Sequence, residues 1–547
     1  MTGEPLGPGP ADPFGEGLAG SMPSGLPSPA SGGTGDWRRR AVRNTVANGL
    51  GRAVAIGTSF LLTPLILHTV GTEPFGLWVL LGSIVAYGSL LDLGIGGAVT
   101  KYIAEHRARG ESSEARSTIA AALRIYLLLG ALAGLVGIAL APVVPRAIGV
   151  PADLEGLAQA TMAVMSIGLG IAIPCTTGLA VLQGLQRWDL AAAIGVAGSL
   201  LVAVGTLVAL ALGWGIVGIA ALGIPVPVAT LLLAVAAVRR AAPDLAFDPL
   251  GGDRATAGRI MGFSWPLFVV DVASRLQSRT DEIVVGVALS LGAVTPYALG
   301  RRLATIPQLV ARQFAGQLLP RASELAALDE RDRLRALYLG GVRVSLAIAL
   351  PLTGCLLLLA GPILDVWVGP GFESGAPIVV ILAVAAVIDL SLWPAAFVLR
   401  GIARHHWLAP IALGSGLANL VLSVALARPF GMVGVALGTL LPTMVEAALV
   451  HTPYTLHTLG IGARHYMSQA LLPALAPLVP MLAVIAVLVR VVPPTSAIAI
   501  VALVAVAHLV YGLFYLAAGP AAPERRLARE LLASVLGPRR LAGRPGP

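Results

Sequence analysis

Long apolar stretches separated by short polar connections fill the sequence from about residue 43 to residue 518. A helix needs about 20 largely apolar residues to cross a bilayer, and this rule predicts fourteen spans. Most connections are too short for an extramembrane domain, so the predicted fold class is an all-α integral membrane protein with about 14 transmembrane helices. The spans lie at roughly 43–68, 75–100, 116–141, 155–181, 189–212, 215–238, 259–289, 293–319, 336–360, 374–400, 406–427, 431–456, 466–489 and 496–518.

Charges in the connections alternate along the chain. The connections that follow odd-numbered spans hold only Arg146, Arg428 and Arg490, whereas the termini and the other connections hold most of the remaining basic residues. Because cytoplasmic loops are enriched in Lys and Arg, both termini are predicted to be cytoplasmic. Only 12% of the residues are charged, against about 25% in soluble domains. The net charge of +9 therefore indicates cytoplasmic loops and contact with the lipid bilayer, not nucleic-acid binding.

Three motifs recur at an offset of roughly 220 residues, which indicates an internal duplication. They begin at Gly71, Leu182 and Gly215 and recur at Gly292, Leu399 and Gly431. Since each copy would hold six helices, both copies share one orientation and are related by an axis along the membrane normal. The predicted organisation is a disordered arm (1–40), a first lobe (41–240), a cytoplasmic linker (241–258), a second lobe (259–457), two extra helices (458–518) and a basic cytoplasmic tail (519–547).

Charged residues also lie inside predicted spans. The seventh span contains Asp271, Arg275 and Arg279, which are spaced four apart and would share one helix face. A charge near the bilayer centre costs at least about 2.5–3.5 kcal/mol, so this face is predicted to look onto a wet cavity or a partner helix. Further charges inside spans are Arg52, Asp92, Arg124, Asp281, Glu282, Arg301, Arg302, Arg312, Asp389 and Glu446.

The bias of these charges towards arginine leaves two interpretations open. Guanidinium groups suit phosphate oxygens, and several of them in one cavity would hold a pyrophosphate. Alternatively, the arginines pair with Asp92, Asp271, Asp281 and Glu282 to lock helices together. Asp389 and Glu446 are interpreted as packing or ion-coupling groups. The two cysteines lie in apolar stretches, so neither a disulfide nor a metal site is indicated, and no cofactor or catalytic group is predicted.

Two segments resemble polysaccharide-type flippases, which move O-antigen and capsule repeat units and belong to the multidrug/oligosaccharidyl-lipid/polysaccharide (MOP) exporter superfamily. The first is Leu90-Leu91-Asp92-Leu93-Gly94-Ile95-Gly96 with Lys101-Tyr102-Ile103-Ala104-Glu105 after it. The second is Asp281-Glu282-Ile283-Val284-Val285-Gly286 with Tyr297-Ala298-Leu299 after it. The resemblance extends over about residues 41 to 460.

The resemblance implies two lobes around a central cationic cavity that opens alternately to each side of a bacterial plasma membrane. The implied substrate is an undecaprenyl-pyrophosphate-linked oligosaccharide, moved from the inner to the outer leaflet for cell-surface polysaccharide biosynthesis. Its implied contacts are Arg52, Arg275, Arg279, Arg301 and Arg302. Asp92, Arg124, Asp271, Asp281 and Glu282 are the predicted coupling or gating residues. Polymerases and glycosyltransferases of the same pathway are candidate partners.

Three alternatives remain open. A lipid II flippase also suits fourteen helices, and a drug or metabolite antiporter of the same superfamily would be expected to have an acid-dominated site. A membrane glycosyltransferase would need acid/base groups on a sizeable loop or domain beside the membrane. Because no such loop is predicted, a transporter is favoured over an enzyme.

Overall fold

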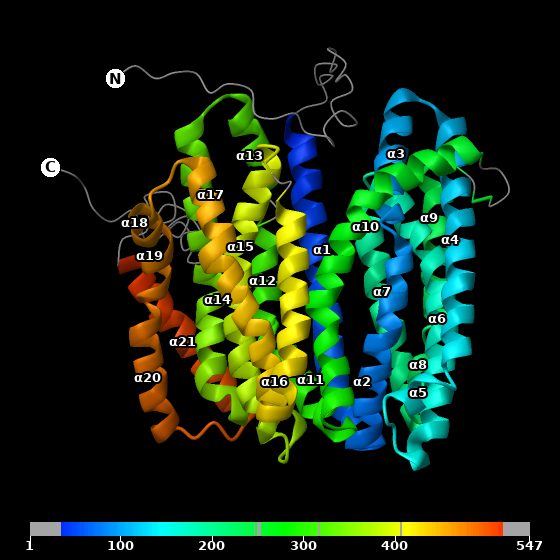
Figure 1. Ribbon diagram of the computed structural model, residues 1–547. Helices are drawn as coiled ribbons and strands as arrows, with labels where there is room; N and C mark the ends of the chain where they lie inside the picture. The colour runs from blue at the N-terminus through cyan, green and yellow to red at the C-terminus, as the bar shows by residue number, and fades with distance from the viewer. Residues whose placement is uncertain (1–33, 246, 249–252, 316–317, 405–406, 518–547) are drawn as a thin grey trace, which may run out of the picture.

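The computed structural model describes residues 34–517 apart from 246, 249–252, 316–317 and 405–406. Within these residues the chain forms helices and no strand, and the long helices stand side by side (Figure 1). In this described part of the chain, eleven helical segments are long and apolar enough to cross a membrane. The predicted all-α membrane fold is therefore confirmed, while the count of fourteen spans stays a prediction.

The first lobe contains ten helical elements. They are α1 (Thr34–Val70), α2 (Thr72–Tyr87), η1 (Gly88–Asp92), α3 (Ile95–Arg109), α4 (Ser112–Leu140), α5 (Val144–Ala147), α6 (Ala152–Gly184), α7 (Trp188–Ala211), α8 (Gly215–Ala221) and α9 (Pro225–Ala241). Helix α1 begins at Thr34, so residues 34–40 are helical and do not belong to the predicted arm. The first proline of α1 is Pro64. The residues from Thr34 to the start of the apolar span therefore contain no proline that would interrupt the helix.

The second lobe and the extra helices follow. They are α10 (Arg254–Ala288), α11 (Leu291–Ala304), α12 (Ile306–Ala315), α13 (Leu318–Ala327), α14 (Arg331–Val368), η2 (Glu373–Gly375), α15 (Ala376–Gly401), α16 (Leu408–Val445), η3 (Glu446–His451), α17 (Thr452–Leu459), α18 (Ala463–Tyr466), η4 (Met467–Leu471), α19 (Leu472–Leu475), α20 (Leu478–Val491) and α21 (Ala497–Ala517). The segment with Asp271 and Arg275 lies inside α10, as predicted. The tail 519–547 lies outside the described residues.

The repeated motifs occupy equivalent places in the two lobes. Helix α6 ends at Gly184 and α15 ends at Gly401. A Cβ atom on Gly184 would lie 2.7 Å from the Cβ of Ile103, and one on Gly401 would lie 2.7 Å from the Cβ of Ala322. Only a glycine permits so close an approach of two helices. The glycine of the second repeated motif therefore makes an equivalent packing contact in each lobe.

The third repeated motif marks a helix break in each lobe. Gly215 has φ of 54° where α8 begins, and Gly431 has φ of 60° within α16. Both values lie in the left-handed region that glycine adopts without steric cost. At Gly431 the ribbon of α16 therefore turns back, and two predicted spans meet there.

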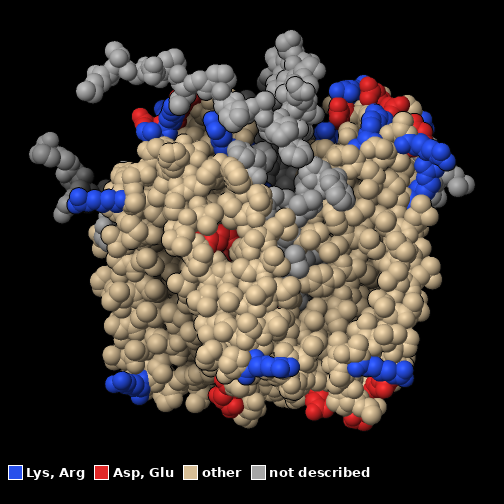
Figure 2. All heavy atoms as spheres, in the orientation of Figure 1, with Lys and Arg blue, Asp and Glu red and all other residues tan. Residues whose placement is uncertain are grey.

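The two ends of the helix bundle differ from its flank in their content of charged residues. Basic and acidic side chains gather at the two ends, and the flank between them is almost uncharged (Figure 2). The beginning of α1, the end of α3 and α13 lie at one end, whereas α5 and the end of α20 lie at the other (Figure 1). The end with α3 and α13 carries the loops that the sequence predicts to be cytoplasmic.

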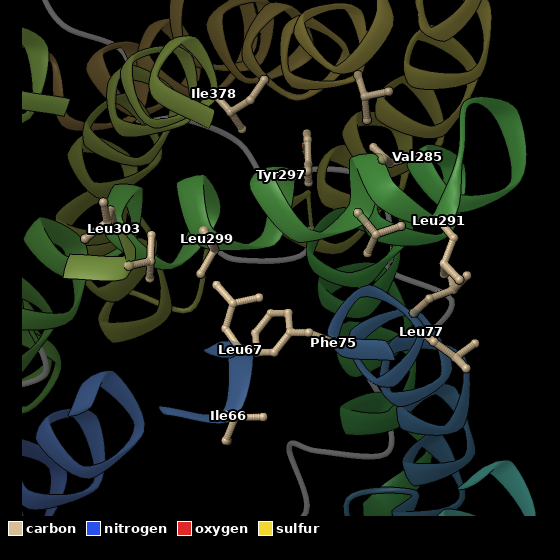
Figure 3. Close-up of a cluster of buried hydrophobic side chains, with 14 of the residues drawn as sticks. Ile66, Leu67, Phe75, Leu77, Val285, Leu291, Tyr297, Leu299, Leu303 and Ile378 are labelled. Atoms are coloured by element: carbon tan, nitrogen blue, oxygen red, sulfur yellow. The ribbon is translucent and has the colours of Figure 1, made fainter. Parts of the chain in front are cut away.

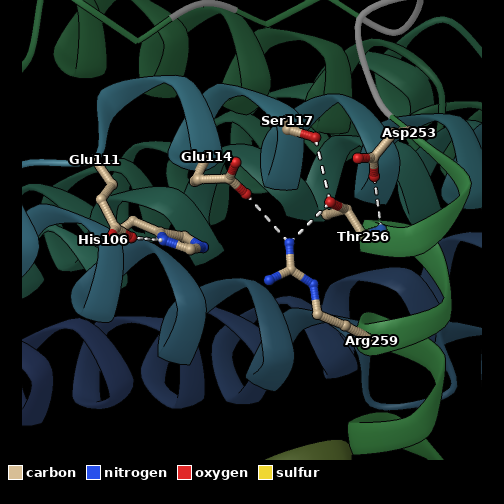
Figure 4. A network of polar contacts seen from close by, with 7 residues as sticks. All are labelled: His106, Glu111, Glu114, Ser117, Asp253, Thr256 and Arg259. Carbon is tan, nitrogen blue, oxygen red and sulfur yellow. Dashed lines mark hydrogen bonds and ion pairs between the residues drawn. The ribbon is translucent and has the colours of Figure 1, made fainter.

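Helix α10 contacts both lobes. Its first turns pack on α3 and α4, where Arg259 Nη2 donates to Glu114 Oε2 at 3.2 Å and to Thr256 Oγ1 at 3.0 Å (Figure 4). Asp253 caps the helix by accepting a hydrogen bond from the Thr256 amide. Hydrogen bonding from Thr256 lowers the pKa of Asp253. The second half of α10 packs on α11 and α16 of the other lobe.

At the end opposite the predicted cytoplasmic face, the lobes meet through α2 and α11. Thr295 Oγ1 donates to the carbonyl oxygen of Thr72 at 2.8 Å. Around this contact Phe75, Leu77, Leu291 and other buried apolar side chains form a core shared by both lobes (Figure 3). Helices α2 and α11 begin with the first repeated motif, so the equivalent helices of the two copies meet each other, as expected near a two-fold axis.

Substituting Gly76 by alanine should loosen this junction. A Cβ atom at Gly76 would lie 2.6 Å from the carbonyl oxygen of Leu291, a backbone atom that cannot rotate away. Overpacking of this kind costs about 1–3 kcal/mol, which a denaturant titration in detergent would measure. Gly82→Ala on the same helix is the matched control, because its Cβ would meet nothing within 4 Å. Equal losses in both variants would show that the junction is not tightly packed.

Candidate functional site: a cavity between the two lobes

A cavity of about 520 Å³ lies between the lobes, above the junction of α2 and α11. Helices α2 and α6 of the first lobe and α10 and α11 of the second form its walls. The lining residues are Trp78, Val79, Gly82, Ser83, Ala86, Met165, Glu282, Ala298, Arg301, Arg302 and Thr305. The site is therefore shared by both copies of the repeat, which is where substrates bind in repeat-built transporters.

Arg301 forms an ion pair across the α10–α11 hairpin. Its Nη1 atom donates to Glu282 Oε1, and the side chains are 20% and 7% exposed. In surroundings of low dielectric the two charges attract strongly and stabilise each other. Arg301 therefore faces the cavity while its charge is largely balanced.

Arg302 lies next to Arg301 and reaches a different helix. Its Nη1 atom donates to Thr63 Oγ1 on α1, and Thr63 in turn donates to the carbonyl oxygen of Ser59 at 2.7 Å. Consecutive residues of a helix point about 100° apart. The two arginines can therefore contact different helices, α10 and α1, and still line one cavity. Arg302 thus connects α11 to α1.

The lining combines cationic, hydroxyl and apolar groups. Among the described lining residues the charged ones are Glu282, Arg301 and Arg302, which together carry one net positive charge. Guanidinium groups bind phosphate oxygens through paired hydrogen bonds. Ser83 and Thr305 offer hydroxyl groups, and Trp78 offers an aromatic face. This set is suited to an anionic ligand with polar and apolar parts.

Asp281 lies behind the cavity wall and holds helices together. It is 3% exposed and accepts hydrogen bonds from Tyr297 Oη at 2.8 Å and Thr439 Oγ1 at 2.9 Å. Asn419 Nδ2 donates to the same threonine oxygen at 2.8 Å. These contacts tie α10 to α11 and α16, so Asp281 positions Glu282 without lining the cavity.

Of the remaining predicted residues, Asp92 and Arg124 do not line the cavity. Asp92 accepts a hydrogen bond from Tyr126 in the first lobe. Arg124 of α4 lies within electrostatic range of Asp253. The side chains of Arg52, Asp271, Arg275, Arg279 and Arg312 lie outside the described ones. The described residues contain no group of three or more metal-ligating side chains.

The sequence did not point to several of the lining residues that could contact a ligand. Trp78, Ser83, Met165 and Thr305 lie inside apolar spans and carry no charge, so no pattern distinguished them from ordinary core residues. Trp78 directly follows the first repeated motif. The repeat therefore marked the right helix but not the side chain that faces the cavity.

The family model for polysaccharide biosynthesis proteins matches residues 41–326, more than half of the chain. The chain belongs to this family. A probable low-salt glycan biosynthesis flippase of Haloferax volcanii, Agl15, is 22% identical over 198 residues, which cover 36% of this chain and 42% of Agl15. The uncharacterized membrane protein EpsK of Bacillus subtilis is 22% identical over 453 residues, which cover 79% of this chain and 86% of EpsK.

Solved structures share the fold of this family member. The lipid II flippase MurJ in an inward closed conformation superposes with a TM-score of 0.67 at 14% identity, over 87% of this chain and 99% of MurJ. An inward-facing multidrug resistance MATE transporter of the MOP superfamily gives 0.63 at 16% identity, over 76% of this chain and 94% of the transporter. The chain is therefore a multi-pass membrane protein of the polysaccharide biosynthesis family, with a two-lobed fold like that of these transporters.

Proposed function

We propose that this protein is a flippase that moves an undecaprenyl-pyrophosphate-linked oligosaccharide from the inner to the outer leaflet of a bacterial plasma membrane. The main support for this proposal is that Arg301 and Arg302 line a cavity formed by both lobes. Family membership and the flippase named among the relatives support the same function.

The cavity chemistry supports a lipid-linked glycan phosphate as the substrate class. Arg302 lines the cavity beside Arg301, and its guanidinium group is suited to binding pyrophosphate oxygens. Trp78 and the hydroxyls of Ser83 and Thr305 suit the apolar faces and hydroxyl groups of sugars. The prenyl chain would stay in the bilayer, because its burial in a small polar cavity would forfeit its contact with lipid.

The transport cycle would alternate the opening of the cavity between the two sides. The contacts of α2 with α11 close the end opposite the basic loops, and α10 packs on both lobes. Separation of α2 from α11, with approach of the lobes at the other end, would expose the same arginines to the outer leaflet. We place both termini in the cytoplasm, and we include Arg52, Arg275 and Arg279 in the substrate contact set as further members.

The decisive experiment measures flipping directly. Proteoliposomes hold a fluorescent undecaprenyl-pyrophosphate-linked oligosaccharide, and a membrane-impermeant quencher is added outside. We expect the protein to expose the inner-leaflet pool to the quencher, whereas protein-free vesicles do not. Substrate arms with lipid II and with an organic cation distinguish the two alternative functions. Transport of the organic cation alone would replace the proposal with a drug antiporter.

A further inference from the structure

A second cavity lies within the second lobe, away from the arginine pair. It has a volume of about 260 Å³ and is lined by α15, α16 and η3. Its walls are mainly apolar, with Trp393 and Phe397 packed edge to face at 6.2 Å between ring centroids. Four of its lining residues carry ionisable groups: Asp389, Arg400, Glu446 and His451. Ionisable groups inside a membrane bundle are costly and therefore point to function.

The backbone brings two of these groups together. Glu446 and His451 are the first and last residues of η3, a π-helical turn. Residues five apart diverge by about 140° on an α-helix, but they stack on a π-helix, whose hydrogen bonds join residues i and i+5. His451 Nδ1 consequently lies 3.7 Å from Glu446 Oε1, beyond hydrogen-bond distance.

His451 is a buried side chain at the wall of the second cavity. The residue is 5% exposed, and neither ring nitrogen has a hydrogen-bond partner among the described atoms. A buried polar group without a partner is costly, so its retention calls for a ligand or a water in the cavity. The cavity has room for several water molecules.

The surrounding groups define which ligand fits. From α15, Asp389 accepts hydrogen bonds from Gln308 and from Trp393 Nε1, the latter at 3.1 Å, while Arg400 lies at the exposed edge. From α16 the lining residues Leu408 and Ala412 contribute no titratable group. Among the described lining residues, Glu446 and His451 are thus the two ionisable groups that lie close to each other. A carboxylate and an imidazole at this separation are suited to binding one proton between them.

We propose that the Glu446–His451 pair is a proton-binding site, separate from the central cavity, whose occupancy controls flipping. The proton comes from water in the second cavity and returns to water when the pair releases it. Proton binding would draw the two side chains into a hydrogen bond and alter how η3 packs between α15 and α16. This inference rests on the proposed function, because it assigns a site through which protons would control the proposed flipping.

A spectroscopic titration tests the site without transport. Infrared difference spectra between about pH 5 and 8 report protonation of carboxyl and imidazole groups. We expect one protonation signal of the native protein to be lost in both Glu446→Gln and His451→Gln. His508→Gln is the matched control, because His508 lies in α21, with Nδ1 2.7 Å from the Val504 carbonyl oxygen. A native spectrum that both substitutions leave unchanged would overturn the proposal.

The flipping assay tests control by the site. We expect the native rate to change about tenfold between about pH 6 and 8, and less than about twofold in His451→Gln and Glu446→Gln. Native-like pH dependence in these variants would refute a controlling role. If the native protein flips no lipid-linked glycan at any pH, the proposed function fails, while the infrared titration still decides whether the pair binds a proton.

Discussion

Replacing Arg302 by alanine is expected to slow flipping of the lipid-linked oligosaccharide about 10- to 100-fold, because a hydrogen bond to a charged group contributes about 1.5–3 kcal/mol. Arg302 lines the central cavity, and its Nη1 atom donates to the Thr63 hydroxyl. Its loss removes one of the two cavity cations that we propose to bind pyrophosphate. The quencher assay measures the rate, and thermal unfolding in detergent verifies that the variant is folded.

Two further variants separate charge from position. Arg302→Lys keeps the charge but loses the forked guanidinium, so we expect an intermediate rate. Thr63→Val removes only the hydroxyl that receives the Arg302 hydrogen bond, so its effect should be smaller than that of Arg302→Ala. A fully active Arg302→Ala protein would remove this residue from the substrate site. If Thr63→Val is as slow as Arg302→Ala, the arginine acts mainly by holding α11 to α1.

Replacing Arg301 by glutamine should reduce stability more than any other single change considered. Glu282 is 7% exposed and would keep its charge without its ion-pair partner. Removing one member of a buried pair costs about 3–5 kcal/mol, and we expect the lower end of this range because Arg301 is 20% exposed to the cavity. Equilibrium unfolding in a denaturing detergent measures the loss.

The charge-neutral double variant is the matched control for Arg301. Glu282→Gln together with Arg301→Gln removes both charges and should recover most of the lost stability, since replacing both partners of a buried pair is far less costly than replacing one. Flipping should remain slow in the double variant, because one cavity cation is absent. Additive losses in the two single variants and the double variant would contradict a direct ion pair.

The sequence contained enough information for the architecture. Apolar stretches of membrane-spanning length predicted an all-α membrane protein, because unpaired backbone groups exclude other structures from lipid. The repeated motifs predicted two equivalent lobes, and their glycines recur at the same helix ends and breaks: Gly184 with Gly401 and Gly215 with Gly431. Where close packing or a positive φ requires glycine, both copies of the repeat keep it. Comparison of the two halves of the sequence therefore detects these positions.

The partners of the charged residues depended on tertiary structure. The sequence placed Arg301, Arg302, Asp92 and Arg124 inside helices as one group, yet the structure joins the first two in the central cavity and puts the others elsewhere. The pairing of Arg301 with Glu282 depends on how α11 turns back on α10.

The second cavity was likewise invisible in the sequence. Glu446 was recognised as a charge inside a span, but its meeting with His451 requires a π-helical turn, and an α-helical pattern would have turned the two side chains apart. Apolar periodicity determines that a segment is a helix in the membrane, because lipid imposes that choice on every such segment. Rotation of each helix about its axis, and the neighbour that each polar face meets, follow only from packing of all the helices together.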